Sequence, residues 1–331
     1  MFKASTRIHQ FLAPALLMLV TLSGSHGAQA QTYPNKPISL YVGFSAGGAA
    51  DGVMRTLAEE MSKQLGQPIT VDNRPGAGGL IATQAVLAAP ANGYSLLFAG
   101  LQLATGPHLN KVNYNPQTDL TMVRQVTSVP VILLAPWDSP VRTAADITAL
   151  AKKKGNALSM GTGGVGTTGH FGTFVLGNGL GVQALHVPFK GGAPGLQALA
   201  GNELDLMFDQ SSSVMQGLID AKKIRIVSVM QEKPASSMPG VKSAAEIGLP
   251  LEVELRGWQG IAVKGGTPAA IVSQINAAIA AAVASPAVKA RVAQFGMELI
   301  SDSTPESFQK YYQAEYDRWG GFIKKYQIKA E

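Results

Sequence analysis

Apolar and polar positions along the chain predict strands and helices in alternation. Short runs rich in apolar and β-branched residues are typical of strands, and they occur at residues 38–42, 69–71, 94–99, 131–135, 158–160, 184–187, 205–208, 224–229 and 258–263. Residues 52–65 carry an apolar side chain at every third or fourth position, which predicts an amphipathic helix. Further helices are predicted to start after Thr143, at Thr267–Pro268, at Ser285–Pro286 and at Thr304–Pro305. This alternation favours parallel sheets with helices on both faces.

The first thirty residues differ from the rest in composition. Lys3 and Arg7 precede the apolar run FLAPALLMLVTL, and the segment closes with Ala28-Gln29-Ala30. A basic start, a short apolar core and an A-x-A end are typical of a secretory signal peptide. We therefore expect residues 1–30 to be removed by cleavage after Ala30, and the remaining protein to be exported and soluble.

Composition narrows the classes of function. The chain has 27 Lys and Arg against 21 Asp and Glu and contains no cysteine, so disulfides, thiolate metal sites and cysteine nucleophiles are excluded. The positive residues are scattered rather than gathered with aromatic residues into a stripe, which argues against nucleic acid as a partner. The length of the exported part, about 300 residues, suits two lobes.

Three glycine-rich or small-residue segments follow predicted strands. They are GFSAGGAAD at residues 43–51, FAGLQLATG at 98–106 and MGTGGVGTTGHFG at 160–172. In α/β sheets ligands bind beyond the carboxyl ends of strands, and glycines let the free N–H groups at a helix start approach an anion. The sequence thus indicates an anion site, although Asp51 and the glycines could equally form a capped turn.

Other candidate motifs are weak. Gly161, Gly163 and Gly166 spell G-x-G-x-x-G, but no acidic residue follows where a dinucleotide site requires one. After the signal peptide the histidines are His108, His170 and His186, whose spacing fits no short metal motif. We expect no cofactor, no metal and no catalytic residue. An exported hydrolase or isomerase with a dispersed active site remains an alternative.

Seven segments in order resemble the Bug family, the periplasmic receptors of tripartite tricarboxylate transporters. They are YPNKPISLYVGFSAGGAAD, ITVDNRPGAGG, ANGYSLLFAG, YNPQTDL, MGTGGVGTTGHF, HVPFKGGAPGLQALAGNELDLMF and GWQGIAVKGGTPAAIVSQINAAI. The resemblance implies a two-lobed α/β periplasmic binding protein of the Venus-flytrap, type II-like kind, with a sheet flanked by helices in each lobe. Residues 31–130 and 256–331 would form lobe one, and residues 131–255 lobe two.

The resemblance also implies which residues bind the ligand, largely through backbone groups, hydroxyls and waters. They are Phe44, Ser45, Gly47, Gly48 and Asp51 in the first loop, Leu101 and Gln102 after the third strand, and Thr162, Gly164, Thr168, His170, Lys190 and Asp209 in the second lobe. Relatives commonly carry Ser or Thr where this chain has Leu101 and Leu103, so we expect a ligand with an apolar or aromatic body.

The resemblance therefore implies a monomeric periplasmic receptor that captures a small organic carboxylate between its lobes for the permease subunits of a tripartite tricarboxylate transporter. It would not be an enzyme. A sensor subunit that presents its ligand-bound form to a signalling partner is a further alternative, because transport and signalling would use the same closure.

Overall fold

Two sheets organise the chain in the computed structural model, which describes residues 33–330. The first has the strand order β11-β4-β10-β3-β1-β2 and the second the order β7-β6-β8-β5-β9. The first comprises β1 (Ile38–Val42), β2 (Ile69–Asn73), β3 (Ser95–Gly100), β4 (Leu120–Pro130), β10 (Arg256–Lys264) and β11 (Glu298–Leu299). The second comprises β5 (Ile132–Pro136), β6 (Ala157–Thr162), β7 (Gln183–Pro188), β8 (Leu206–Asp209) and β9 (Ile224–Val229). The predicted signal peptide lies outside the described residues.

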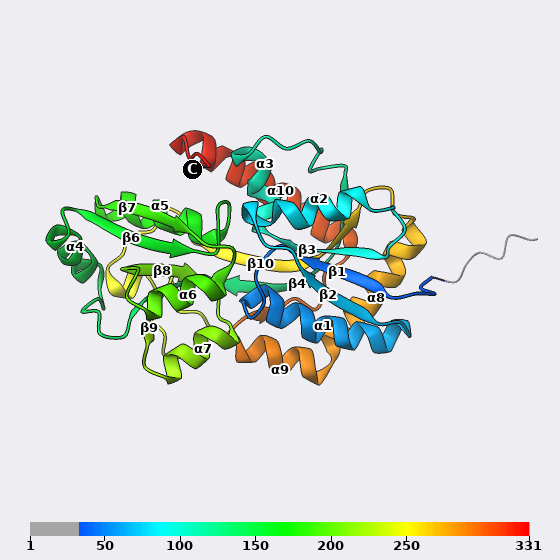
Figure 1. Ribbon diagram of the computed structural model, residues 1–331, viewed down its shortest axis with the longest axis horizontal. Helices are drawn as coiled ribbons and strands as arrows, with labels where there is room; N and C mark the ends of the chain where they lie inside the picture. Colours follow the sequence, from blue (N-terminus) through cyan, green and yellow to red (C-terminus); the bar gives the residue numbers. More distant parts are fainter. Residues whose placement is uncertain (1–32, 331) are drawn as a thin grey trace, which may run out of the picture. The chain divides into compact units, whose positions relative to one another are not determined.

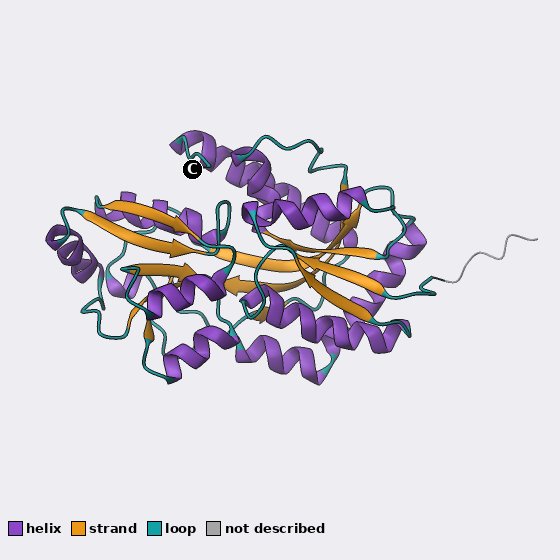
Figure 2. Cartoon of the chain, in the orientation of Figure 1, coloured by secondary structure: helices purple, strands orange, loops and turns teal. Residues whose placement is uncertain are grey.

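Each sheet carries its own helices, and we call a sheet with its helices a lobe (Figures 1 and 2). The first lobe has α1 (Ala49–Leu65), α2 (Leu80–Ala88), α3 (Leu101–Leu109), α8 (Ala269–Ala284), α9 (Pro286–Gln294) and α10 (Pro305–Tyr326), with the 3-10 turn η1 (Ala77–Gly79). The second has α4 (Ala144–Lys153), α5 (Thr168–Leu180), α6 (Gly192–Ala200) and α7 (Ser213–Asp220). The 3-10 turn η2 (Ala245–Ile247) lies between β9 and β10.

The prediction of parallel sheets is wrong, because both sheets are mixed. Strands β1, β2 and β3 are parallel, but β10 is antiparallel to β3 and β4. In the second sheet β5 is antiparallel to β8 and β9. The antiparallel strands adjoin the two crossings between sheets: the chain leaves the first sheet at Pro130 and returns to it at Arg256. A strand that the chain enters from the other sheet is thus antiparallel to its neighbours.

Strand β4 was not predicted from the sequence, because polar residues interrupt its apolar pattern. Arg124 is 6% exposed, and its guanidinium donates to Asn276 Oδ1 at 3.1 Å and to the Ser301 carbonyl at 2.5 Å. Both partners lie in the first lobe and hydrogen-bond the two terminal nitrogens of the buried cation, while its Nε has no partner. The strand therefore contains a buried charged residue at a position where the sequence pattern predicts the end of a strand.

Helix α10 packs on both lobes through aromatic rings. Near its start, Phe308 meets Trp258 of β10 edge to face, with ring centroids 5.5 Å apart. Nearer its end, Trp319 lies 4.5 Å from Phe171 of α5. The helix thus joins the sheet of the first lobe to a helix of the second.

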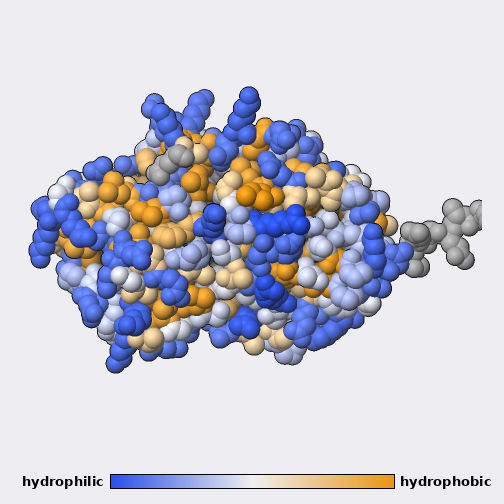
Figure 3. Space-filling view, in the orientation of Figure 1, coloured by the Kyte–Doolittle hydropathy of each residue, from blue (hydrophilic) through white to orange (hydrophobic). Residues whose placement is uncertain are grey.

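The face of the protein shown in Figure 3 mixes hydrophilic residues with smaller apolar areas. Ile81 and Leu185 are the large apolar side chains with the highest exposure among the described residues, at 47% and 46%. No single described helix is long and apolar enough to cross a membrane, and α8 with α9 meets that length and composition only as a pair bent by 69°.

Candidate ligand-binding site

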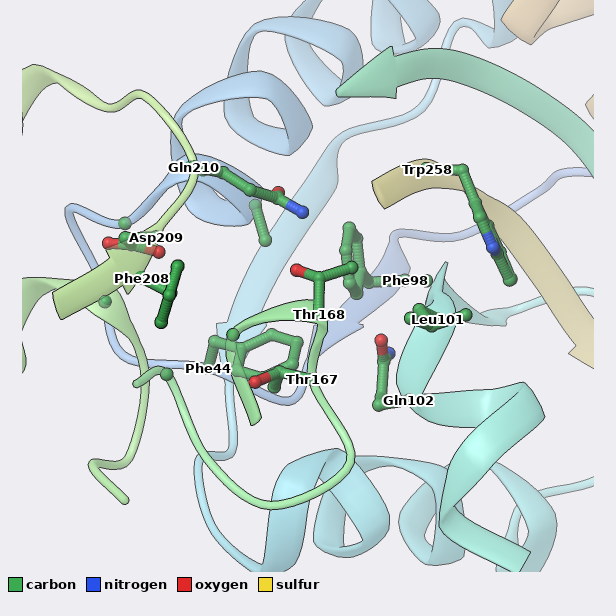
Figure 4. Close-up of a pocket in the computed structure, with 17 residues that line it drawn as sticks. Phe44, Phe98, Leu101, Gln102, Thr167, Thr168, Phe208, Asp209, Gln210 and Trp258 are labelled. Carbon is green, nitrogen blue, oxygen red and sulfur yellow. The ribbon is translucent and has the colours of Figure 1, made fainter. Parts of the chain in front are cut away.

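A cavity of about 70 Å³ lies between the two lobes (Figure 4). One enclosed water needs roughly 10–15 Å³ by the same kind of measure, so the cavity has room for a small molecule and not for a chain of sugars or residues. The first lobe contributes Phe44, Gly48, Ala49, Ala50, Phe98, Gly100, Leu101, Gln102 and Trp258 to its wall. The second contributes Gly163, Thr167, Thr168, Gly169, Gly192, Phe208, Asp209 and Gln210.

Four helices begin at this cavity. The first residues of α1, α3, α5 and α6 all line it, namely Ala49, Leu101, Thr168 and Gly192. In none of the four does a side chain cap the free N–H groups. By contrast, α4, α7, α9 and α10 are capped by Ser or Thr hydroxyls. Helices α2 and α8 also lack a side-chain cap, but their first residues do not line the cavity. Free N–H groups and the positive ends of four helix dipoles suit an anion.

Asp51 fixes the conformation of the first glycine-rich loop and does not line the cavity. Asp51 is 4% exposed, and its carboxylate accepts hydrogen bonds from the Gly47 N–H at 2.9 Å and from Arg55 and Asn73, both at 3.0 Å. Burial opposes ionisation, but these hydrogen bonds outweigh it and lower the pKa of Asp51. Gly47 has φ +82°, which only glycine adopts easily, whereas Gly48 has φ −76°.

Apolar rings form much of the wall. Phe44 and Phe98 meet edge to face with centroids 5.8 Å apart. Leu101 and Leu103 are 4% and 2% exposed and both belong to the packed core, but only Leu101 also lines the cavity. Of the two leucines that motivated the prediction of an apolar ligand, only Leu101 therefore faces the cavity.

Two buried polar atoms in the wall have no hydrogen-bond partner. They are Asp209 Oδ2 and Trp258 Nε1. In Figure 4 these two residues lie at opposite sides of the view, with Thr168 and Phe98 between them. Burial raises the pKa of Asp209 to about 7, and a hydrogen bond from the backbone N–H of Gln210 only partly opposes this rise. Most buried polar atoms in proteins are hydrogen-bonded, so these two leave unused hydrogen-bonding capacity in residues of the cavity wall.

Three predicted residues lie behind the cavity instead of lining it. The hydroxyl of Thr162 is 2.7 Å from His186 Nε2 and 3.2 Å from the N–H of Gly164, which donates to it. His170 stacks on His186 with centroids 4.4 Å apart and accepts a hydrogen bond from the Gly166 N–H. Burial lowers the pKa of His170 to about 4, so its ring is neutral at pH 7. These residues support the loop before α5.

Ser45 and Lys190 join the lobes at the edge of the cavity and do not line it. The Ser45 backbone N–H and hydroxyl both donate to the Lys190 carbonyl, at 3.0 and 2.6 Å, while the Lys190 side chain is exposed. A second direct link runs from the Thr105 hydroxyl to the Gly166 carbonyl at 2.5 Å. Gly47 also lies at this junction, because a Cβ there would be 3.1 Å from Val214 of α7.

Of the thirteen predicted site residues, six line the cavity, and sequence reasoning missed most of the rest of the wall. Those that line it are Phe44, Gly48, Leu101, Gln102, Thr168 and Asp209. Phe98, Phe208 and Trp258 were missed because an aromatic residue in a strand normally predicts core packing. Gly192 was missed because its loop carries no distinctive spacing, although a glycine pair before a helix was a usable signal. No group of residues that could hold a metal ion occurs within residues 33–330.

A two-lobed α/β fold with a small cavity between its lobes defines a solute-binding protein of the periplasmic type. Its sequence matches the model of the tripartite tricarboxylate transporter family receptor over residues 53–328. The chain therefore belongs to this family of receptors, as the resemblance predicted.

Relatives and solved structures agree with this assignment. The chain is 30% identical to the UPF0065 protein in the tcbD-tcbE intergenic region of Pseudomonas sp. (strain P51), over 95% of this chain and 94% of the relative. It is similar to the periplasmic binding protein BugD, with a TM-score of 0.83 and 31% identity over 90% of this chain and 100% of that one. It is also similar to MatC from Rhodopseudomonas palustris with bound malate, with a TM-score of 0.80 and 29% identity over 88% of this chain and 100% of that one.

Proposed function

We propose that the interlobe cavity captures one small organic carboxylate, held by the N–H groups at the starts of α1, α3, α5 and α6. The observation that carries this proposal is the convergence of four helix N-termini without side-chain caps on one cavity. The unpartnered Nε1 of Trp258, a residue of the cavity wall that is 1% exposed, supports it independently, because an indole N–H can only donate. The malate bound to MatC, and the adipate bound to another R. palustris protein of TM-score 0.81, are ligands of the expected kind.

We further propose that the body of the ligand is apolar or aromatic and packs against Phe44, Phe98, Leu101 and Trp258. Apolar surface removed from water contributes roughly 25 cal/mol per Å², so a phenyl-sized body would add a few kcal/mol to binding. Lys190 plays a minor part in this arrangement, because its side chain is exposed outside the cavity wall.

The family consists of periplasmic receptors, and its members deliver their solutes to a transporter. For this chain we propose export by a signal peptide cleaved after Ala30, action as a monomer, and delivery to the permease subunits of a tripartite tricarboxylate transporter. The lobes would comprise residues 31–130 with 256–331, and residues 131–255. The division of strands between the sheets supports these limits.

Thermal-shift measurements with benzoate, adipate, malate, citrate and glutamate test the proposal. A ligand at about 100 times its Kd stabilises a protein by roughly 2.7 kcal/mol. We expect benzoate and adipate to raise the melting temperature more than citrate or glutamate, with each acid recovered unchanged. Stabilisation by none of the five would contradict carboxylate capture, conversion of the acid would favour the hydrolase or isomerase alternative, and a higher rank for citrate would contradict the apolar body.

A further inference from the structure

Asp209 is the one ionisable residue among those that line the cavity. A receptor for an acid would be expected to place a cation there, yet the wall holds neither Lys, Arg nor His. A carboxylate ligand therefore enters a space whose only side chain capable of full charge carries the same sign as the ligand.

The cavity wall holds no cationic side chain to pair with Asp209, although its carboxyl lies beside the first residue of α6. Its backbone pairs with Ile132 of β5, and its carboxyl lies so close to Gly192 that a Cβ on that glycine would be 2.0 Å from Oδ2. From α5, the cavity wall contains Thr167, Thr168 and Gly169, and from α1 it contains Gly48, Ala49 and Ala50, none of which titrates.

The nearest titratable groups along these elements are unsuited to the role of counter-ion. His170 on α5 is buried against His186, and burial keeps its pKa at about 4, so it carries no charge at pH 7. Lys190, just before α6, is exposed and makes its contact with Ser45 through its carbonyl. Burial is accordingly what sets the pKa of Asp209, at about 7 in the ligand-free protein.

The electrostatics of such a site favour a shared proton. Keeping two carboxylates ionised in one buried space costs free energy, because their charges repel. One of them therefore takes up a proton, and it is the group that is harder to ionise. Under the proposed function the ligand carboxylate would lie at the starts of four uncapped helices, which would stabilise its charge. Asp209 Oδ2 has no hydrogen-bond donor at all, so the proton is better placed on Asp209.

We propose that Asp209 binds the captured acid as a neutral carboxylic acid, donating its proton in a hydrogen bond to the ligand, so that capture takes up one proton from solvent wherever Asp209 is ionised beforehand. This inference rests on the proposed function of the cavity. No other reactant is involved: the proton comes from water or buffer, joins Asp209 when the ligand binds and returns to solvent when it leaves.

The proposal fixes the direction of the pH dependence. Below the pKa of the free protein Asp209 already carries the proton, and affinity does not change with pH. Above it the proton must be taken up, so affinity falls as pH rises, by up to about tenfold per pH unit. With a free pKa of about 7, the Kd should be about tenfold higher at pH 8 than at pH 6, with about 0.9 proton taken up at pH 8.

Isothermal titration calorimetry with benzoate and adipate measures both quantities. Titrations at pH 6 in MES and in bis-Tris, and at pH 8 in HEPES and in Tris, give the Kd and, from the difference in heat between buffers, the number of protons exchanged. The amide of Asp209→Asn can donate a hydrogen bond but cannot titrate. At pH 6 this variant should bind up to about tenfold more weakly than the unmodified protein, and its own Kd should be the same at pH 8 as at pH 6. Asp138→Asn, which removes an exposed carboxylate outside the cavity wall, should keep the tenfold ratio.

The outcomes separate this inference from the function on which it rests. Binding with equal Kd at both pH values and no proton uptake would overturn the inference and leave carboxylate capture intact. Release of protons on binding would also overturn it, because it would mean that a group in the site loses a proton when the acid binds, whereas the proposal requires Asp209 to gain one. An absence of binding by both acids at both pH values would overturn the inference together with the proposed function.

Discussion

The hydrogen bond from Thr105 to Gly166 allows the closure of the lobes to be weakened without altering the cavity wall. Thr105 is fully buried on α3 of the first lobe, and its hydroxyl lies 2.5 Å from the Gly166 carbonyl of the second lobe. The same hydroxyl lies 3.2 Å from the Leu101 carbonyl within its own helix. Thr105→Val keeps the shape of the side chain and removes the donor.

The expected magnitude follows from the burial of the bond. In the closed form the Gly166 carbonyl would lose its partner, at a cost of about 1–3 kcal/mol, whereas with the lobes apart water would replace it. The whole cost therefore falls on closure. A ligand that contacts both lobes binds by favouring the closed form, so its Kd should rise by a factor of about 5–150 if the free protein is mainly open.

Calorimetry with benzoate or adipate measures the change, and Thr83→Val is the matched control. Thr83 is 1% exposed on α2, and its hydroxyl donates to the Gly79 carbonyl at 3.2 Å, a bond that stays within the first lobe. At a ligand concentration that just saturates Thr83→Val, small-angle scattering should show a larger radius of gyration for Thr105→Val, because less of that variant is closed. Equal Kd values for the two folded variants would refute the assignment of this bond to closure.

Three further predictions concern the cavity itself. Gly48→Val should abolish measurable binding while the circular dichroism spectrum stays unchanged. Gly48 lines the cavity at φ −76°, and the nearest neighbour of an added Cβ would be 3.6 Å away, so the fold should tolerate the side chain. The control Gly321→Val, at an open position on α10, should bind normally, and normal binding by Gly48→Val would contradict the site. Lys190→Ala should change the Kd by less than about threefold, since exposed charges contribute little; a larger loss would indicate a direct ion pair. Ligand should alter the tryptophan fluorescence through Trp258, so Trp258→Phe should remove the change and Trp137→Phe should retain it.

Local patterns in the sequence were enough to predict most elements of this fold. The run at residues 38–42 coincides with β1, and the helices predicted at Ser285 and Thr304 start there because each residue caps its helix. The direction of β5 and β10 could not be predicted, since it depends on where the chain crosses between sheets. Arg124 hid β4 for a related reason: its partners Asn276 and Ser301 are distant in sequence.

The site was predictable to the extent that it is built from strand ends. Gly48 and Thr168 were found because each stands at the strand-to-helix junction where α/β folds place ligands. Trp258 was not predicted, because an aromatic residue in a buried strand such as β10 produces the same apolar pattern whether it lines a cavity or only packs in the core. His170 illustrates the opposite error of a chemically suggestive residue that packs behind the loop.

The proposed anchor of main-chain N–H groups has a consequence for the diversification of these receptors. Substitutions change side chains and leave the backbone donors of α1, α3, α5 and α6 in place, so residues such as Leu101 and Phe98 can vary while the capacity to hold a carboxylate persists. Recognition of the acid group and recognition of the rest of the molecule can thus evolve separately. A gene duplicate could acquire a new substrate through a few replacements in the wall without passing through a form that binds nothing.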